Sequence, residues 1–413
     1  MEKPKIRFKG YQEDWEQRKL IDLVDVLDGD RGKNYPTSDD FDISGHTLFL
    51  NASNVTNDGF LFQDNQFITE EKSNSMGNGK LEEDDIVVTS RGSLGHIAWY
   101  NADISSFVPY ARINSGMLIL RNKKEIETEY LYHFMKSSKG QSQISFISFG
   151  SAQPQLTKKG VEDLEVILPT RRDEQVQLGH YFSNLDNLIT LHQRKCEETK
   201  ILKKYMLQKM FPQNGHSVPE IRFSGCTEDW EQRKFGEIVE KYEDPIETPT
   251  EGYTRLGIRS HAKGTFHSYV EKGKELETAK MFRVAADKFI VNITFGWEHA
   301  VAITDENDAG KLVSHRFPQY SFNAGMNPNF FRYLILDENF KHHLELSSPG
   351  GAGRNRVLKL SDMLEYKMNF PSEAEQKKIA AYFDDLDNLI TLHQQKCDEL
   401  RNIKKFMLQN MFI

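Results

Sequence analysis

Two histidine–cysteine pairs are the first residues of this chain whose types and spacing suggest chemistry. His192 precedes Cys196 by four positions, and His393 precedes Cys397 by the same interval. Residues four apart share one face of a helix, so the two pairs could together supply the four ligands of a Cys2His2 zinc site. The same positions also fall on an apolar helical stripe, where cysteine acts as a small apolar residue. We favour the stripe and expect no metal site.

A second set of side chains has the types that read nucleic-acid bases. Glutamine can pair with adenine and arginine with guanine, each through two hydrogen bonds, and other basic residues can contact phosphates. The alternative is an ordinary solvated surface. The candidates are Arg31, Lys33, Ser90, Arg91, Ser93, Arg112, Gln153, Gln155, Lys158 and Lys159 in the first half of the chain, and Arg255, Arg259, Lys263, Arg283, Thr294, Trp297, Arg354, Asn355 and Arg356 in the second.

The motifs of two enzyme classes are incomplete. Residues 77–80 read Gly-Asn-Gly-Lys but are followed by Leu81 and lack the earlier glycine of a phosphate-binding GxxxxGK[ST] loop, which argues against ATP hydrolysis. Residues 327–330, Asn-Pro-Asn-Phe, are similar to the Asn-Pro-Pro-Phe tetrapeptide of adenine methyltransferases, but no glycine-rich cofactor turn accompanies them. We interpret this segment as a helix cap. The chain is expected to be non-catalytic and to bind no cofactor itself.

The elements that position these residues come from an internal duplication. Residues 181–211 and 382–412 match at 21 of 31 positions, at an offset of 201 residues. A shorter entry motif, which contains Trp15 and recurs around Trp230, has an offset of 215 residues. Between these markers the two halves diverge. A repeated frame with different inserts predicts a pseudo-two-fold arrangement with two different recognition surfaces.

The repeated segment reads as a long helix. It holds neither glycine nor proline from Tyr181 to Phe211, and about 31 residues at 1.5 Å each predict a rod of roughly 46 Å. One such stripe could be an ordinary buried helical face, but two matching copies predict helices that pack on each other or dock identical partner subunits. The stripe positions are Leu185, Ile189, His192, Cys196, Thr199, Leu202, Met206 and Met210 in one copy, and Leu386, Ile390, His393, Cys397, Leu400, Ile403, Met407 and Met411 in the other.

The two inserts read as mixed α/β domains. Strand-like runs cover residues 47–50, 85–89, 96–99 and 116–120 in the first, and 288–292 and 300–303 in the second, with helices at 129–136 and 329–336. The predicted boundaries are a first domain at 1–169, a spacer helix at 170–212, a second domain at 213–370 and a second spacer helix at 371–413. The fold class is α+β (mixed): two α/β domains separated by two long helices, packed as a pseudo-two-fold symmetric antiparallel coiled coil.

Composition and charge narrow the functional classes. A net charge of −8 and a pI of about 6.0 argue against a protein that coats nucleic acid, so DNA binding would need a confined basic surface. The three cysteines form no CxxC pair and are expected to stay reduced. No run approaches the roughly 20 apolar residues of a membrane span, and the start lacks an apolar signal core, so a cytoplasmic protein is expected.

Together these features resemble the DNA-specificity subunit of type I restriction-modification systems. The resemblance rests on the duplicated domain-plus-helix organisation, on Ser-Arg-Gly-Ser-Leu-Gly at 90–95 and on Gly-Ser-Ala-Gln-Pro-Gln-Leu at 150–156, and it covers essentially the whole chain. It implies two target-recognition domains, each reading one half of a bipartite site in double-stranded DNA. It also implies helices that set the spacing between the half-sites.

The same resemblance implies the partners. Two methyltransferase subunits would dock on the helices, and two restriction/translocase subunits could join them, so that S-adenosylmethionine, ATP and Mg²⁺ are expected on the partners. Aligned without gaps, the second domain has Phe295 at the position of Arg91 and Arg354 at that of Gln153, as different half-sites would require. The rival hypothesis is a coiled-coil protein-interaction adaptor that does not bind DNA. Salt-dependent binding to duplex DNA would separate the two hypotheses.

Overall fold

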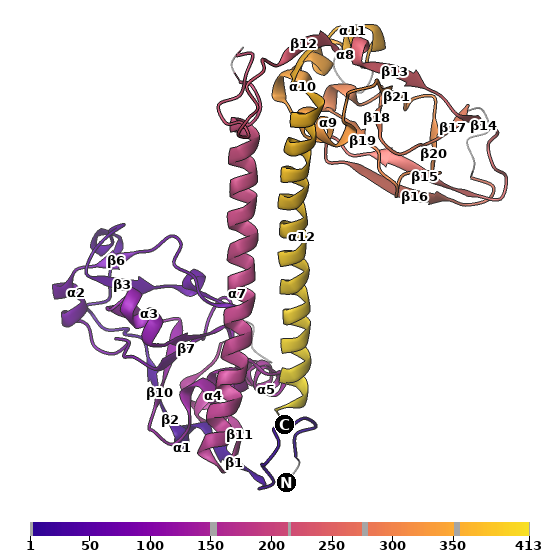
Figure 1. The fold of residues 1–413 in the computed structure, drawn as a ribbon. Helices are drawn as coiled ribbons and strands as arrows, with labels where there is room; N and C mark the ends of the chain where they lie inside the picture. The colour runs from indigo at the N-terminus through magenta and orange to yellow at the C-terminus, as the bar shows by residue number, and fades with distance from the viewer. Residues whose placement is uncertain (1–2, 149–154, 214–215, 275–279, 351–355, 413) are drawn as a thin grey trace. The chain divides into compact units, whose positions relative to one another are not determined.

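The chain forms two compact units, each built around parts of the same two helices. The computed structural model describes residues 3–148, 155–213, 216–274, 280–350 and 356–412. Unit 1 comprises Met1–Gln193 and Gln394–Ile413, and unit 2 comprises Arg194–His393. The boundaries fall inside α7 (Arg172–Lys209) and α12 (Glu373–Asn410), which have 38 residues each (Figure 1). Each unit therefore contains the first part of one long helix and the last part of the other.

Unit 1 combines four small sheets with short helices. Its sheet orders are β1-β11, β2-β10-β7-β8, β6-β3-β9 and β4-β5. The strands are β1 (Trp15–Lys19), β2 (Val24–Asp28), β3 (Thr47–Leu50), β4 (Val55–Thr56), β5 (Gly59–Phe60), β6 (Phe67–Ile68), β7 (Asp85–Thr89), β8 (Ile97–Tyr100), β9 (Ala111–Ile113), β10 (Met117–Asn122) and β11 (Glu165–Pro169). The helices besides α7 and α12 are α1 (Leu20–Leu23), α2 (Glu70–Ser75), α3 (Ala102–Phe107), α4 (Thr128–Lys136), α5 (Ser138–Ser148) and α6 (Lys158–Glu162).

Unit 2 repeats part of this plan and adds a five-stranded sheet. Its sheet orders are β12-β22, β13-β21-β18-β19 and β14-β17-β20-β15-β16. The strands are β12 (Glu231–Lys234), β13 (Val239–Tyr242), β14 (Pro245–Ile246), β15 (Tyr253–Ile258), β16 (Thr265–Val270), β17 (Met281–Arg283), β18 (Lys288–Val291), β19 (Val301–Ile303), β20 (Leu312–Ser314), β21 (Gln319–Phe322) and β22 (Lys367–Phe370). The helices are α8 (Phe235–Ile238), the 3-10 helix η3 (Gly296–Glu298), α9 (Pro328–Leu334), α10 (Glu338–Leu346) and α11 (Leu360–Leu364).

In each unit the entry motif pairs with the strand that precedes a long helix. Trp15 begins β1, which pairs antiparallel with β11 just before α7 starts, and Trp230 precedes β12, which pairs with β22 just before α12. Both indoles are buried, with 2% and 4% exposure. An arginine of each motif forms a bidentate ion pair with a buried glutamate in the first turn of the following long helix. These pairs are Arg7–Glu174 and Arg222–Glu375.

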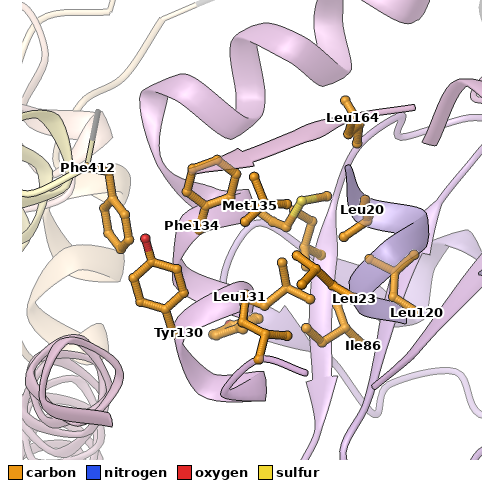
Figure 2. Close-up of a cluster of buried hydrophobic side chains, with 14 of the residues drawn as sticks. Leu20, Leu23, Ile86, Leu120, Tyr130, Leu131, Phe134, Met135, Leu164 and Phe412 are labelled. Atoms are coloured by element: carbon orange, nitrogen blue, oxygen red, sulfur yellow. The ribbon is translucent and has the colours of Figure 1, made fainter. Parts of the chain in front are cut away.

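The main core of each unit is closed by an aromatic residue at the end of a long helix. In unit 1 the ring of Phe412 lies 5.5 Å from that of Tyr130 and 6.0 Å from that of Phe134, both on α4 (Figure 2). In unit 2 the ring of Phe211 lies 5.6 Å from that of Phe330 on α9. The domain core and the helix end are therefore one packing unit, stabilised by the removal of apolar surface from water.

Within each unit the two helix segments run antiparallel. In unit 1, Phe182 of α7 stacks on Phe412, and further along α7 the backbone oxygen of Ile189 accepts a hydrogen bond from the Cys397 thiol, with an S–O distance of 3.6 Å. Residue numbers thus rise on α7 while they fall on α12. The same contacts recur in unit 2 at the offset of 201 residues, as Phe383 with Phe211 and as Ile390 with Cys196 at 3.8 Å.

One part of the predicted stripe is wrong. Leu202 and Ile403 are exposed, at 43% and 37%. The lysine that follows each of them faces the opposite helix instead. Lys203 forms an ion pair with Asp387 at 2.5 Å in unit 2, and Lys404 pairs with Asp186 in unit 1. An aspartate on the opposite helix compensates the half-buried ammonium, which a pattern of apolar positions does not reveal.

Most predicted elements are confirmed, with shifted ends. The strands expected at 47–50 and 85–89 are β3 and β7, and those expected at 96–99, 116–120, 288–292 and 300–303 are β8, β10, β18 and β19 within two residues. The helices expected at 129–136 and 329–336 are α4 and α9. The long helices begin nine residues before the duplicated segment: α7 starts three residues after Pro169, and α12 starts two residues after Pro371.

Candidate nucleic-acid interface

Three chain segments of unit 1 meet at what we term the first loop junction, residues 89–95, 114–116 and 155–156. The amide of Ser90 donates to the carbonyl of Gly116 at 2.8 Å, and the amide of Arg91 donates to the same oxygen at 3.2 Å. The amide of Leu156 donates to the carbonyl of Ser90 at 3.0 Å. The junction is thus held by backbone hydrogen bonds, which leave the side chains at its edge free to differ.

Unit 2 contains the same arrangement, the second loop junction, at residues 292–299, 315–317 and 356–358. The amide of Ile293 donates to the carbonyl of Arg316 at 3.0 Å, and the amide of Leu358 donates to the carbonyl of Ile293 at 2.8 Å. Ile293 therefore takes the place of Ser90, and Arg316 the place of Gly116.

These bonds correct the gapless alignment of the two loops. With Ile293 equivalent to Ser90, Thr294 rather than Phe295 matches Arg91, because the second loop is one residue longer before its strand β19. In the later segment Leu156 matches Leu358, since both side chains are buried, whereas Val357 is 51% exposed. The predicted sites Gln153, Arg354 and Asn355 lie outside the described residues.

Several predicted residues of unit 1 meet at the first junction. Arg91 and Ser93 are exposed on its first segment, and Gln155 is half-buried on its third. The guanidinium of Arg31 donates to the carbonyl of Ser115, which brings the loop after β2, with the exposed Lys33, to the same edge. Among the described residues, this edge therefore carries the exposed basic side chains of Arg91, Arg31 and Lys33 and the amide of Gln155.

Two other predicted residues of unit 1 are misplaced for DNA contact. Arg112 is 2% exposed, and its guanidinium donates to the carbonyl oxygens of Ser73, Gly77 and Asn78 at 2.5–2.8 Å. Burial lowers the pKa of Arg112. The side chain of Ser90 is 1% exposed. Buried groups of this kind cannot reach a phosphate, so we assign Arg112 to holding the 73–78 loop and Ser90 to the backbone of the junction.

Two lysines expected to contact phosphates are already partnered. Lys158 lies 3.8 Å from Glu162 at the end of α6, and Lys159 lies 3.3 Å from Asp163, the residue that follows this helix. Arg31 likewise lies 3.6 Å from Asp28. These exposed pairs contribute little to stability because water and salt screen them, so a phosphate could replace the carboxylate at small cost.

In unit 2 the predicted residues gather around η3. The guanidinium of Arg356 lies over the ring of Trp297, 5.5 Å from its centroid, which joins the third segment of the junction to the first. The loop between β15 and β16 is fixed beside them, because the amide of His261 donates to the carbonyl of Glu298 at 2.8 Å. This loop carries the exposed Arg259 and Lys263.

The two remaining predicted arginines of unit 2 lie on its five-stranded sheet. Arg255 is exposed on β15 and lines a cavity of about 450 Å³, together with Phe295 and Phe317 of the second junction. Arg283 ends β17 and lies 3.6 Å from Asp244. Arg255 therefore adjoins the junction, whereas Arg283 already has a carboxylate.

Arg316 was not among the predicted residues. Its side chain is exposed on the middle segment of the second junction, and its guanidinium lies 3.5 Å from the hydroxyl oxygen of Thr294. The loop between β20 and β21 contains no repeat or glycine motif, and the residue in the same place of the first junction is Gly116. Only the backbone hydrogen bonds identify this position.

The long helices also have a second, exposed apolar face that the repeated stripe does not predict. The predicted partner-contacting residues Leu185, Ile189, Cys196, Leu386 and Cys397 are buried within their units, while His192, Met206, Ile390, His393 and Met407 are half-buried. Four apolar side chains per helix are instead exposed at equivalent positions, between 37% and 59%. They are Leu188, Leu191, Leu202 and Tyr205 on α7, and Leu389, Leu392, Ile403 and Phe406 on α12.

The structure offers no metal-binding cluster in the part of the chain that it describes: no three His, Cys, Asp or Glu residues there gather to hold an ion. Among the same residues, no helix has both the length and the apolar character needed to cross a membrane.

Comparison with known proteins defines the class. The sequence model of the type I restriction modification DNA specificity domain matches twice, at residues 12–200 and 227–402, and so covers most of the chain. The chain therefore belongs to the family of type I restriction-modification DNA specificity subunits, whose role is the recognition of DNA sequence. Each match covers one variable domain and most of the long helix that follows it.

Individual relatives agree with this assignment over nearly the full length. The chain is 24% identical over 411 residues to the type I restriction enzyme MjaVIII specificity subunit of Methanocaldococcus jannaschii, covering 95% of this chain and 91% of that protein. The putative MjaX specificity subunit of the same organism gives the same identity and coverage. The crystal structure of the S subunit from M. genitalium superimposes with a TM-score of 0.62 at 13% identity, covering 100% and 99% of the two chains, which shows a shared fold.

Proposed function

We propose that each unit reads one half of a bipartite site in double-stranded DNA through its loop junction. The observation that carries this proposal is that the same backbone junction occurs in both units with different exposed side chains at its edge. A recognition surface needs this combination, because base edges are distinguished by the type of hydrogen-bonding side chain presented to them. The domain boundaries are 1–169 and 213–370, with spacers at 170–212 and 371–413.

The two long helices act as the spacer between the half-sites. Their antiparallel contacts recur at an offset of 201 residues, which supports a pseudo-two-fold antiparallel coiled coil along α7 and α12. Each helix has 38 residues, about 57 Å at 1.5 Å per residue. Lengthening both helices by equal insertions changes the distance between the two recognition surfaces and therefore the gap in the DNA target.

The exposed apolar residues of α7 and α12 support the docking of two identical partner subunits. Their equivalent positions in both helices give each copy of the partner the same surface. We propose two methyltransferase subunits there, with two restriction/translocase subunits joining the assembly. The chain itself is the non-catalytic specificity component. S-adenosylmethionine, ATP and Mg²⁺ bind to the partner subunits.

Mapping methylated adenines in a host that expresses the complete system tests the proposal. Replacing residues 20–165 with the corresponding domain of another specificity subunit should change one half of the methylated motif and leave the other half intact. A change in both halves, or in neither, would contradict the assignment of one half-site to each unit. The methylated motif from the unmodified chain is the control.

The adaptor hypothesis makes a different prediction for binding. DNA recognition that neutralises phosphates makes affinity fall steeply between about 50 and 200 mM salt, whereas a protein adaptor shows no duplex binding with such a dependence. Measuring the affinity of the assembled methyltransferase complex for duplex DNA across this range separates the two. Family membership already favours DNA recognition.

A further inference from the structure

The two loop junctions each carry one exposed arginine at the same corner, but from opposite segments. In the first junction Arg91 extends from the first segment, and the middle segment has Gly116, where an added Cβ would lie 3.8 Å from the Cβ of Arg91. In the second junction the middle segment provides Arg316, and the first segment has Thr294, which receives its guanidinium at 3.5 Å. A small residue thus faces an arginine in both cases, with the roles of the segments exchanged.

We propose that Arg316 reads a base in the half-site of unit 2, as the counterpart of Arg91 in unit 1. The proposal rests on the proposed function, since it presumes that unit 2 contacts duplex DNA through its junction. It names a specificity-determining residue that the repeat cannot show, because the equivalent residue in the first copy is a glycine. The base is a guanine, because a guanidinium can donate two hydrogen bonds to its O6 and N7 atoms in the major groove.

The electrostatic surroundings of Arg316 favour this role over a structural one. Within the described ranges, no carboxylate lies within ion-pair distance of Arg316 or of Arg91, in contrast to Arg31 and Arg283. Among the described residues, the only side-chain hydrogen bond of Arg316 is the long one to the neutral hydroxyl of Thr294. Its guanidinium donors can therefore turn to a base without breaking an ion pair. No carboxylate among the described residues loses a partner when they do.

The position of Arg316 is fixed although its side chain is exposed. Its carbonyl accepts the amide of Ile293 at 3.0 Å, the amide of Phe317 donates to the carbonyl of Ser314 at 3.0 Å, and the amide of His315 donates to the carbonyl of Lys280 at 3.1 Å. A backbone held at three consecutive residues presents the side chain from a defined origin. Base readout requires such a fixed origin, since a bidentate contact tolerates little displacement.

The test uses the assembled specificity–methyltransferase complex and a library of duplexes in which each base pair of the second half-site is varied. Arg316→Ala should reduce the preference for guanine at one position of that half-site by roughly 5- to 140-fold. Every position of the first half-site should keep its preference. Arg91→Ala should give the mirror result, and Arg233→Ala, which removes an exposed arginine of β12 that is paired with Glu231, should change neither half-site.

Arg316→Lys separates base readout from phosphate binding. Lysine keeps the charge but loses the planar pair of donors, so a base reader should lose discrimination while the salt dependence of binding stays unchanged. If Arg316→Ala weakens all duplexes equally and lowers the salt slope by about one, Arg316 contacts a phosphate and the inference is overturned. Unchanged discrimination in Arg316→Ala also overturns it.

The wild-type complex decides whether the underlying function itself holds. If it methylates a bipartite motif with a specified second half-site and Arg316→Ala reads that half-site unchanged, only the inference about Arg316 fails. If the wild-type complex shows no sequence preference at all, the proposed function fails. Thermal unfolding of Arg316→Ala should match wild type, because the replaced side chain is exposed.

Discussion

Replacing Phe412 by alanine should destabilise the core of unit 1 around α4. The ring is 6% exposed and stacks on Phe182, with 5.4 Å between the ring centroids. The rings of Tyr130 and Phe134 lie 5.5 and 6.0 Å from it, on α4 (Figure 2). Removing a buried phenylalanine costs about 3–5 kcal/mol, from lost transfer free energy and the cavity left behind. Phe412 lies at a helix end that can relax into this cavity, so we expect the lower end, about 3 kcal/mol.

Hydrogen exchange measures this loss locally. A decrease of about 3 kcal/mol in the free energy of opening corresponds to amide exchange roughly 100-fold faster in α4 and the first part of α7, the elements against which the ring packs. The amides of α9 and β22 in unit 2 should keep their protection in the Phe412→Ala chain.

Two variants serve as matched controls. Phe211→Ala removes the equivalent ring, which lies 5.6 Å from Phe330 and 6.0 Å from Phe383, and should accelerate exchange in α9 instead of α4. Phe406→Ala removes a phenylalanine of the same helix that is 55% exposed, and should change exchange by less than threefold. If Phe412→Ala leaves the protection of α4 intact, the helix end is not part of the core of unit 1, and this reasoning is refuted.

Three further predictions concern an ion pair, a histidine and the exposed helical face. Arg222→Met leaves Glu375 buried at 2% exposure without its partner and should destabilise unit 2 by about 3 kcal/mol in denaturant unfolding; an unchanged midpoint would contradict a structural ion pair. Burial lowers the pKa of His133, so the unfolded chain binds its proton more readily and the stability of unit 1 should fall as pH drops below about 6.5; His133→Gln should remove that part of the slope when unfolding is followed between pH 7 and 5. Phe406→Ala should weaken binding of the methyltransferase subunit at least fivefold in a titration while DNA half-site preferences stay the same, and equal binding would exclude this face as the docking surface.

The repeated frame was predictable because its buried residues recur at the spacing of a helix or a strand, which is visible in the sequence. Leu185, Ile189 and Cys196 recur at helical spacing and are buried, and the run at 85–89, rich in β-branched residues, forms β7, an inner strand of its sheet. The pattern failed where a polar residue replaces an apolar one at an interface. Lys203 is such a case, because only its distance from Asp387 in the folded unit explains why it, and not Leu202, faces the opposite helix.

The candidate site was less predictable because long-range contacts decide which basic residues are exposed. Arg112 and Arg91 are both arginines of the same domain. The guanidinium of Arg112 is hydrogen-bonded to carbonyl oxygens of a loop 34 to 39 positions earlier, whereas Arg91 is exposed. Arg316 was not predicted because the sequence repeat does not mark its position. Its equivalent in the first copy is Gly116, and the match exists only in backbone hydrogen bonds.

The chemistry of the two kinds of contact explains why one part of the duplication is repeated and the other is not. The helix contacts depend on particular side chains, such as Phe182 against Phe412 and Lys404 against Asp186, so a change on one side costs free energy unless the other side changes too. The loop junctions are held by amides and carbonyls, which every residue except proline supplies in full. Their side chains can therefore change one at a time without loss of the junction. A corner held in this way can present an arginine from either segment, as Arg91 and Arg316 do, and recognition can change while the frame stays the same.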